Sequence, residues 1–238
     1  MRIEYSVSTM SAEHHQNEDA GAAFEGQLAS GWRAAICVAD GLGSLCDSAA
    51  VSREATSTPP LDRDAELTHA VIAWSQAANA SIGLRFDSAK VGTTFACMLI
   101  SEDSYALASV GDCRAYRVRG QTVDLLTTDD TRLSQMLGRT PTRVEAKEGG
   151  DPARHLTKWL DGTAREDEYY NVSGGPVVGD EVFVLASDGL WTELEPTELL
   201  PLAADGPLQK ALDDLVLRAW LLDPTDDVTC AAIRLRAS

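Results

Sequence analysis

Four short apolar segments follow one another closely in the middle of the chain, at residues 93–100, 105–110, 114–119 and 122–126. They carry the β-branched and aromatic residues that are typical of strands. Only two to four residues separate each segment from the next, whereas a parallel connection needs about a dozen or more. We therefore expect antiparallel pairing here, with Gly120-Gln121 as the last turn.

Strand and helix patterns flank this central region. An apolar face with helical spacing runs from Leu67 to Ile82. Similar patterns predict strands at 2–9, 32–39, 181–187 and 227–235, and helices at about 195–204 and 207–222. Antiparallel strands with helices before and after them favour an α+β layered domain over a doubly wound one. Because no repeat or linker interrupts the pattern, we expect residues 1–238 to form a single domain.

Residues 139–180 differ from the rest of the chain. They contain Gly149-Gly150, Gly174-Gly175-Pro176 and few periodic apolar positions. We expect this segment to be an excursion carried on the surface of the domain.

Acidic residues outnumber basic ones by 37 to 20, which gives a net charge of −17 with neutral histidines. This charge repels nucleic acid and anionic lipid surfaces, so we expect neither as a partner. The sequence has no apolar run long enough to cross a membrane and no signal-peptide pattern in Met1 to Met10. The five cysteines form no C-x-x-C pair, which indicates buried free thiols rather than a zinc site. We therefore expect a cytoplasmic protein.

Carboxylates stand at strand ends or in the turns beside them, at Glu18-Asp19, Asp40, Asp112, Asp188 and Asp226. A single Asp-Gly pair, such as Asp40-Gly41 or Asp188-Gly189, is by itself typical of an ordinary turn. Here two matching pairs follow strands of the buried type. Several carboxylates without Lys or Arg among them repel one another unless a cation lies between them. The pattern therefore predicts a metal site.

The donor atoms limit both the metal and the reaction. All the candidates are oxygen donors, which favours Mg²⁺ or Mn²⁺ over Zn²⁺. Two such ions about 3.5 to 4 Å apart can activate water for attack on a phosphorus or carbonyl centre. Gly41 fits such a site, because a residue without Cβ lets its carbonyl approach a metal. Covalent serine or cysteine catalysis is disfavoured, because the chain has no G-x-S-x-G elbow and its four histidines have no obvious Ser or Cys partner. A Walker A lysine motif is absent too.

Seven short motifs follow one another over nearly the whole chain: Asn17-Glu18-Asp19-Ala20, Val38-Ala39-Asp40-Gly41-Leu42-Gly43, Gly92-Thr93-Thr94, Val110-Gly111-Asp112-Cys113-Arg114-Ala115-Tyr116, Leu126-Thr127-Thr128-Asp129, Ala186-Ser187-Asp188-Gly189-Leu190 and Asp226-Asp227-Val228-Thr229. Each is weak alone. In this order and strand context they resemble the metal-dependent Ser/Thr protein phosphatases of type 2C, the PPM family. The resemblance implies a four-layer α-β-β-α sandwich of two antiparallel sheets flanked by helices, with a metal centre at one end.

The resemblance also implies ligands for two metal ions. Asp40 corresponds to the carboxylate that both ions share, and Gly41 to the residue whose carbonyl binds one of them. Asp188 and Asp226 correspond to ligands of the other ion. Glu18 would hold the first ion directly or through water.

Two further acids have implied roles. Asp19 corresponds to a residue that orients ordered water at the centre. Asp112 is similar to the acid that, in bacterial members, holds a weaker third ion together with the counterpart of Asp188. A turn acid paired with Arg114 is the alternative interpretation of Asp112.

The chain departs from the family pattern in two places. His14 stands where the family usually has an arginine that grips the substrate phosphate, and histidine offers fewer donors and is mostly neutral near pH 7. We expect weaker phosphate affinity, with His14, alone or with His15, contacting phosphate or protonating the leaving oxygen. A solvated loop histidine is the alternative. The second departure is 139–180, where the family carries a flap, and which is here compatible with a mobile lid.

The predicted function is metal-dependent hydrolysis of phosphoserine or phosphothreonine in a protein substrate of a Ser/Thr kinase, with two or three Mn²⁺ or Mg²⁺ ions. Two alternatives remain open. One is a phosphatase-like binding or regulatory protein with weak or no turnover, which His14 motivates. The other is a phosphatase for a small phosphorylated metabolite or for an anti-sigma-factor antagonist.

Overall fold

The computed structural model describes residues 1–26, 31–42, 47–59, 66–88, 90–150, 155–223 and 225–237. In these ranges the strands form two five-stranded sheets, and every pair of neighbouring strands is antiparallel. In order across the first sheet lie β1 (Arg2–Met10), β10 (Val228–Arg236), β9 (Glu181–Ala186), β6 (Arg114–Arg119) and β7 (Thr122–Leu125). In order across the second lie β2 (Asp19–Glu25), β3 (Ala34–Asp40), β4 (Phe95–Ile100), β5 (Ser104–Val110) and β8 (Asn171–Pro176).

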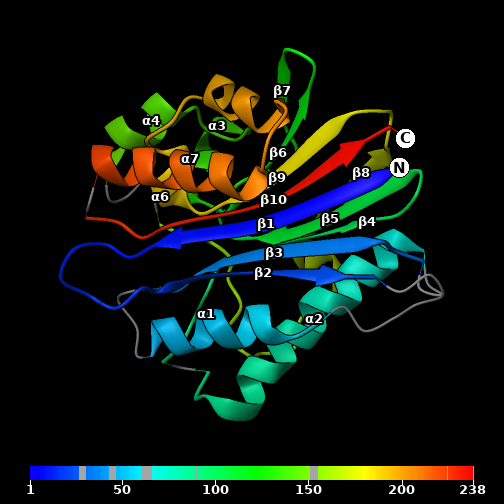
Figure 1. The fold of residues 1–238 in the computed structure, drawn as a ribbon. Coiled ribbons are helices and arrows are strands. Elements are labelled where there is room, and N and C mark those ends of the chain that lie inside the picture. The colour runs from blue at the N-terminus through cyan, green and yellow to red at the C-terminus, as the bar shows by residue number, and fades with distance from the viewer. Residues whose placement is uncertain are drawn as a thin grey trace.

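Helices cover the outer face of each sheet (Figure 1). On the second sheet lie α1 (Ser48–Ser57) and α2 (Leu67–Arg85). On the first sheet lie α6 (Asp188–Trp191), the 3₁₀ segment η2 (Pro196–Ala203) and α7 (Leu208–Leu222). The layer order is therefore helix, sheet, sheet, helix, and the predicted four-layer sandwich is confirmed.

Three apolar cores hold these layers together. Ile36, Met98 and Phe183 are fully buried between the sheets. Trp74 of α2 packs beneath the second sheet, and Val216 of α7 packs on the first. Because both faces of β3 are covered, its sequence is a continuous apolar run rather than an alternating one.

One junction in the central region differs from expectation. Segments β4 and β5 pair with each other, and so do β6 and β7, but β5 and β6 belong to different sheets. The expectation that all four pair in sequence is therefore wrong at residues 111–113. Gly111 turns there at φ +96°, and a Cβ on it would lie 2.7 Å from the Thr94 side chain. This crossing between the sheets is what brings Asp112 to the end of the sandwich.

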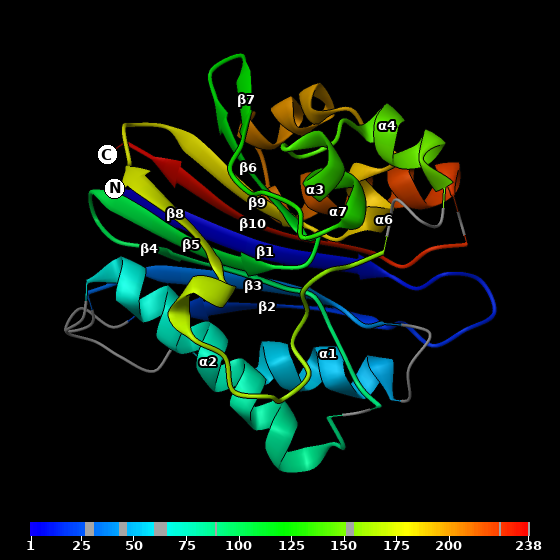
Figure 2. The same cartoon turned by 180° about the vertical axis from the view of Figure 1, so that it is seen from behind.

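Residues 139–180 are more ordered than predicted. They include α4 (Arg143–Glu148), the 3₁₀ turn η1 (Asp167–Tyr169) and β8, which pairs with β5 as an edge strand. The chain from 155 to 170 crosses from the side of α3 (Arg132–Leu137) to α2 (Figure 2). Bridges from Thr131 to Leu156 and from Thr93 to Leu160 attach it to the sandwich. The expected surface excursion therefore applies to only part of this segment.

Outside 139–180 the elements β2, α1, α3 and α6 were not predicted. In β2 and α1 the many Ala and Ser residues give little hydrophobic contrast. The four described cysteines, Cys37, Cys97, Cys113 and Cys230, are buried free thiols, whereas Cys46 and Gly43 lie outside the described residues. Across the ranges given above, no helix combines the length and apolar character that a bilayer span requires.

Candidate metal centre

A cavity of about 300 Å³ opens at the end of the sandwich where β3 and β9 finish and β10 begins. Six of its lining residues carry carboxylates, and none of the described residues that line it is Lys or Arg. The lining consists of His15, Glu18, Asp40, Gly41, Leu42, Thr94, Asp112, Leu156, Asp188, Asp226 and Asp227. The structure thus brings together every acid that the sequence placed at the metal except Asp19, which is buried and is not among the lining residues.

Strand ends deliver these acids from five separate parts of the chain. Asp40 is the last residue of β3, and Asp19 faces it across the β2–β3 pair. Asp188 begins α6 directly after β9, and Asp226 precedes β10. Asp112 lies in the connection from β5 to β6. Because the strands converge at one end of the sandwich, residues up to 212 positions apart, His15 and Asp227, meet in one cavity.

The two Asp-Gly pairs contain glycine for a steric reason. A Cβ on Gly41 would lie 2.8 Å from the Glu18 carbonyl oxygen and 2.6 Å from that of Ser48. A Cβ on Gly189 would lie 2.1 Å from the Asp227 carbonyl oxygen. Each glycine lets another acid-bearing segment approach closely. In addition, the Gly41 N–H donates to the Glu18 carbonyl at 3.0 Å.

Electrostatics make this cluster unfavourable when its acids are ionised without a cation. Burial raises the pKa of Asp40 well above its usual value, and the charges of Asp19 and Asp188 raise it further. Burial also raises the pKa of Asp112, again with a contribution from Asp188. For Asp226 burial and Asp188 together raise the pKa to about 7. A divalent cation would remove this repulsion, because it favours the charged form of each acid.

Asp19 is buried next to Asp40. Its carboxylate accepts a hydrogen bond from the Ser187 hydroxyl at 2.6 Å, and burial raises its pKa well above the usual value. The side chain therefore has a fixed place between the strand end that carries Asp40 and the start of α6.

Arg114 does not pair with Asp112 as the alternative interpretation required. Its guanidinium makes two hydrogen bonds to Asp129, at 3.1 and 2.8 Å, and stacks 3.5 Å from the Trp191 ring centroid. The Trp191 indole N–H in turn donates to the Asp112 backbone carbonyl at 3.0 Å. The Asp112 carboxylate thus faces the cavity while its backbone is anchored from behind.

The two histidines occupy different places. His14 has a side chain that is 93% exposed, adopts φ +73° and lies 3.9 Å from Glu13. It does not line the cavity. His15 does line it, and its Nδ1 lies 2.7 Å from the Gln16 carbonyl oxygen. That contact, opposed by desolvation and aided by Asp227, raises the pKa of His15.

The donor set fits a hard divalent ion. Within the described ranges, no group of three or more His, Cys, Asp or Glu side chains is placed so that it could hold a metal ion by itself. Mg²⁺ keeps several waters and binds through one or two carboxylates, so a complete protein cage is not required. The Asp40 and Asp188 carboxylates and the Gly41 carbonyl provide oxygen donors of this kind. The raised pKa of Asp40 reflects burial and repulsion between the acids, which a bound divalent cation would offset.

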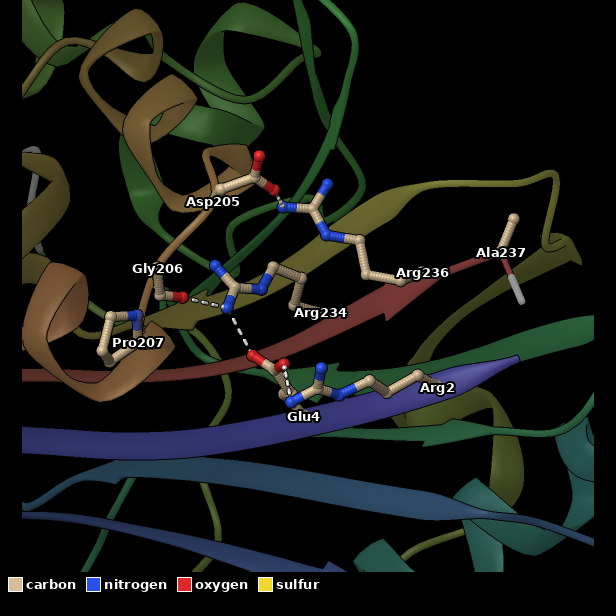
Figure 3. A pocket seen from close by; sticks show the side chains of 8 residues that line it. All are labelled: Arg2, Glu4, Asp205, Gly206, Pro207, Arg234, Arg236 and Ala237. Atoms are coloured by element: carbon tan, nitrogen blue, oxygen red, sulfur yellow. Dashed lines mark hydrogen bonds and ion pairs between the residues drawn. The ribbon is translucent and has the colours of Figure 1, made fainter.

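A second cavity, of about 780 Å³, lies at the opposite end of the sandwich. Arg2, Arg234 and Arg236 line it together with Glu4 and Asp205 (Figure 3). Arg2 pairs with Arg236 across β1 and β10, while Met10 pairs with Val228 at the acidic end. The nine residues of β1 run from one end to the other, and their eight steps place the two cavities roughly 27 Å apart.

The arginines of this second cavity are occupied by groups of the protein. Arg234 has a side chain that is 4% exposed, donates to the carbonyls of Leu202, Ala204 and Gly206, and pairs with Glu4. Arg2 pairs with the same Glu4 at 3.0 Å. The cluster therefore ties the end of η2 to the sheet.

Solved structures of bacterial Ser/Thr phosphatases share this two-sheet sandwich with flanking helices. By sequence alone, no protein-family model and no curated protein matches the chain.

Three solved structures illustrate the likeness. The Staphylococcus aureus serine/threonine phosphatase Stp1 superposes with a TM-score of 0.81 at 22% identity, over 100% of this chain and 96% of that one. The Mycobacterium tuberculosis serine/threonine phosphatase PstP/Ppp gives 0.80 at 21% identity, over 99% of both chains. The catalytic domain of PstP in complex with two manganese ions gives 0.76 at 19% identity, over 99% of both chains. The fold that the motifs implied is therefore confirmed.

Proposed function

We propose that this chain is a metal-dependent phosphatase that hydrolyses phosphoserine or phosphothreonine in a protein substrate. The observation that carries the proposal is the cavity of six carboxylates without a lysine or arginine among its described lining residues. The shared fold with named Ser/Thr phosphatases supports it, and so do the two manganese ions in the PstP complex.

The proposed ligands are those that the resemblance implied and that line the cavity. Asp40 would serve both ions, and the Gly41 carbonyl and Glu18 would complete one of them. Asp188 and Asp226 would hold the other, and Asp112 with Asp188 would hold a weaker third ion. Mn²⁺ or Mg²⁺ bound there would make water a better nucleophile and neutralise charge on the phosphate.

The remaining roles belong to side chains beside the acids. Asp19, fixed by the Ser187 hydroxyl, would accept a hydrogen bond from ordered water at the centre. His15, rather than His14 alone, would contact the substrate phosphate, because His15 lines the cavity. In the tautomer whose Nδ1–H donates to the Gln16 carbonyl, Nε2 of the neutral ring is an acceptor, and it becomes a donor when the ring is protonated.

The substrate setting is also part of the proposal. A phosphoprotein made by a Ser/Thr kinase in the cytoplasm would be the partner, and residues 1–238 would form one catalytic domain. Residues 139–180 would act as its flap, since Leu156 from that segment lines the cavity.

The test is turnover of an aryl phosphate and of phosphoserine and phosphothreonine peptides, with Mn²⁺ and with a chelator. We expect hydrolysis with Mn²⁺ and its loss on chelation. Mn²⁺ binding without turnover of any of these substrates would instead favour a phosphatase-like binding protein. Turnover of small metabolites without turnover of peptides would favour a metabolite phosphatase.

A further inference from the structure

Asp227 holds both ends of the loop that carries Glu18 and His15. Its Oδ1 accepts the Ala12 backbone N–H at 2.7 Å, and its Oδ2 accepts the Glu18 backbone N–H at 2.7 Å. The side chain is only 6% exposed. One carboxylate thus closes a loop of which residues 13–16 are exposed.

The same carboxylate also lies beside a cavity residue. The Nδ1 atom of His15 is 3.9 Å from Asp227 Oδ2. The backbone of Asp227 is itself closely packed, because its carbonyl lies where a Cβ on Gly189 would be. Asp227 thus packs closely against the start of α6, which carries Asp188, and its carboxylate holds the 11–18 loop.

We propose that Asp227 is a positioning residue that holds the 11–18 loop so that Glu18 and His15 face the acidic cavity. This inference rests on the proposed function for its consequence, because Glu18 is one of the proposed metal ligands. Asp227 would act on metal affinity through Glu18 rather than by touching substrate. Groups that orient a metal ligand are commonly worth about 10- to 100-fold in affinity or activity.

A carboxylate suits this task better than an amide. Two backbone donors need two acceptor oxygens, and hydrogen bonds to an ionised acceptor are short and strong. In Asp227→Asn, one oxygen could still accept an N–H, but the amide NH₂ would face the other donor. The variant keeps the size of the side chain and removes one end of the clamp.

The first measurement is amide hydrogen exchange in the metal-free protein. We expect at least one of the Ala12 and Glu18 amides to exchange at least about tenfold faster in Asp227→Asn, as expected for the loss of a hydrogen bond to a charged group. Amides of β3 and β9 should keep the wild-type rate. Unchanged exchange at both positions, or equal acceleration throughout the sheets, would overturn the proposal.

The second measurement is the Mn²⁺ affinity of the same variant. We expect it to fall about tenfold in Asp227→Asn and by less than about twofold when Glu18→Gln is already present. A merely structural role would lower the melting temperature without this dependence on Glu18. Equal losses in both backgrounds would therefore contradict action through Glu18.

Asp180→Asn is the matched control. Asp180 also accepts a backbone N–H, that of Ala237 at 2.6 Å, but near the opposite end of the sandwich. It should leave the Ala12 and Glu18 exchange rates and the Mn²⁺ affinity unchanged. A wild-type protein that bound no Mn²⁺ would contradict the proposed function, whereas the amide exchange rates decide the role of Asp227 without metal.

Discussion

The two ends of the sandwich carry charge in opposite ways. At one end, six carboxylates line a cavity that has no lysine or arginine among its described lining residues. At the other, three arginines line a larger cavity, and Glu4, Asp205 and backbone carbonyls already bind their guanidinium groups. The comparison separates the arginine cluster, whose charges are paired within the protein, from the carboxylate cluster, whose charges call for a bound cation. Removing one partner from charge that is satisfied within the chain destabilises the fold, whereas charge of one sign held together calls for a counter-ion.

The largest expected effect is at the acidic end. Asp40→Asn removes the proposed shared ligand, and the transition-state stabilisation that metal ions supply is worth several kcal/mol. We expect turnover of phosphopeptides with Mn²⁺ to fall at least about 10³-fold. Asp180→Asn at the opposite end is the control and should retain wild-type turnover. Comparable turnover in Asp40→Asn would show that the acidic cavity is not the active site.

A substitution at the arginine end should change stability instead of turnover. Arg234→Met leaves three carbonyls and Glu4 without their buried partner. We expect the free energy of unfolding, measured in urea, to fall by about 3 kcal/mol. Arg2→Met, at a side chain that is 76% exposed, should cost less than about 1 kcal/mol. If the two variants lost equal stability, the structural interpretation of Arg234 would fail.

The two histidines allow a sharper comparison within the acidic end. His15→Ala should raise KM for a phosphopeptide by about tenfold, the effect of losing one hydrogen bond to a charged group. His14→Ala should change KM by less than twofold, because its side chain points into solvent. Steady-state kinetics with Mn²⁺ measure both variants. A larger increase in KM for His14→Ala than for His15→Ala would instead assign the phosphate contact to His14.

The smallest expected effect is on the pH dependence of stability. Burial and neighbouring acids raise the pKa of Asp40 and Asp112, and that of Asp226 to about 7. The folded state then binds more protons than the unfolded chain between about pH 4 and pH 7. Stability of the metal-free protein should therefore fall as pH rises through that window.

Thermal melts between pH 5 and 8 test this linkage. We expect the melting temperature without metal to fall by several degrees across this range, and saturating Mn²⁺ to reduce the change. Asp40→Asn should also reduce the change, because it removes one of the repelling charges. A flat profile without metal would mean that the acids do not repel one another as the structure indicates.

The sequence was sufficient for the parts of the molecule with strong local patterns. The apolar face from Leu67 to Ile82 predicted α2, and the apolar runs predicted β3 and β9. The acids were identified together, because each lies at the end of a strand or in the turn beside one. The four-layer arrangement came from the family resemblance rather than from the patterns themselves.

Tertiary packing determined what the patterns did not reveal. No local signal shows that the short turn at Gly111 crosses between sheets rather than closing a hairpin. The Ala-rich β2 has little apolar contrast and is a strand because it pairs with β3. His14 and His15 are adjacent, so only the loop conformation decides which one faces the cavity. Asp227 belongs to one of the seven motifs, but its role depends on contacts with residues more than 200 positions away.

Calorimetric titration of Mn²⁺ into the metal-free protein tests the central claim most directly. The account predicts binding of at least two ions by the wild type, with loss of that heat in Asp40→Asn and no change in Asp180→Asn. Absence of binding by the wild type, or an identical isotherm for Asp40→Asn, would contradict the claim that the clustered carboxylates hold divalent cations.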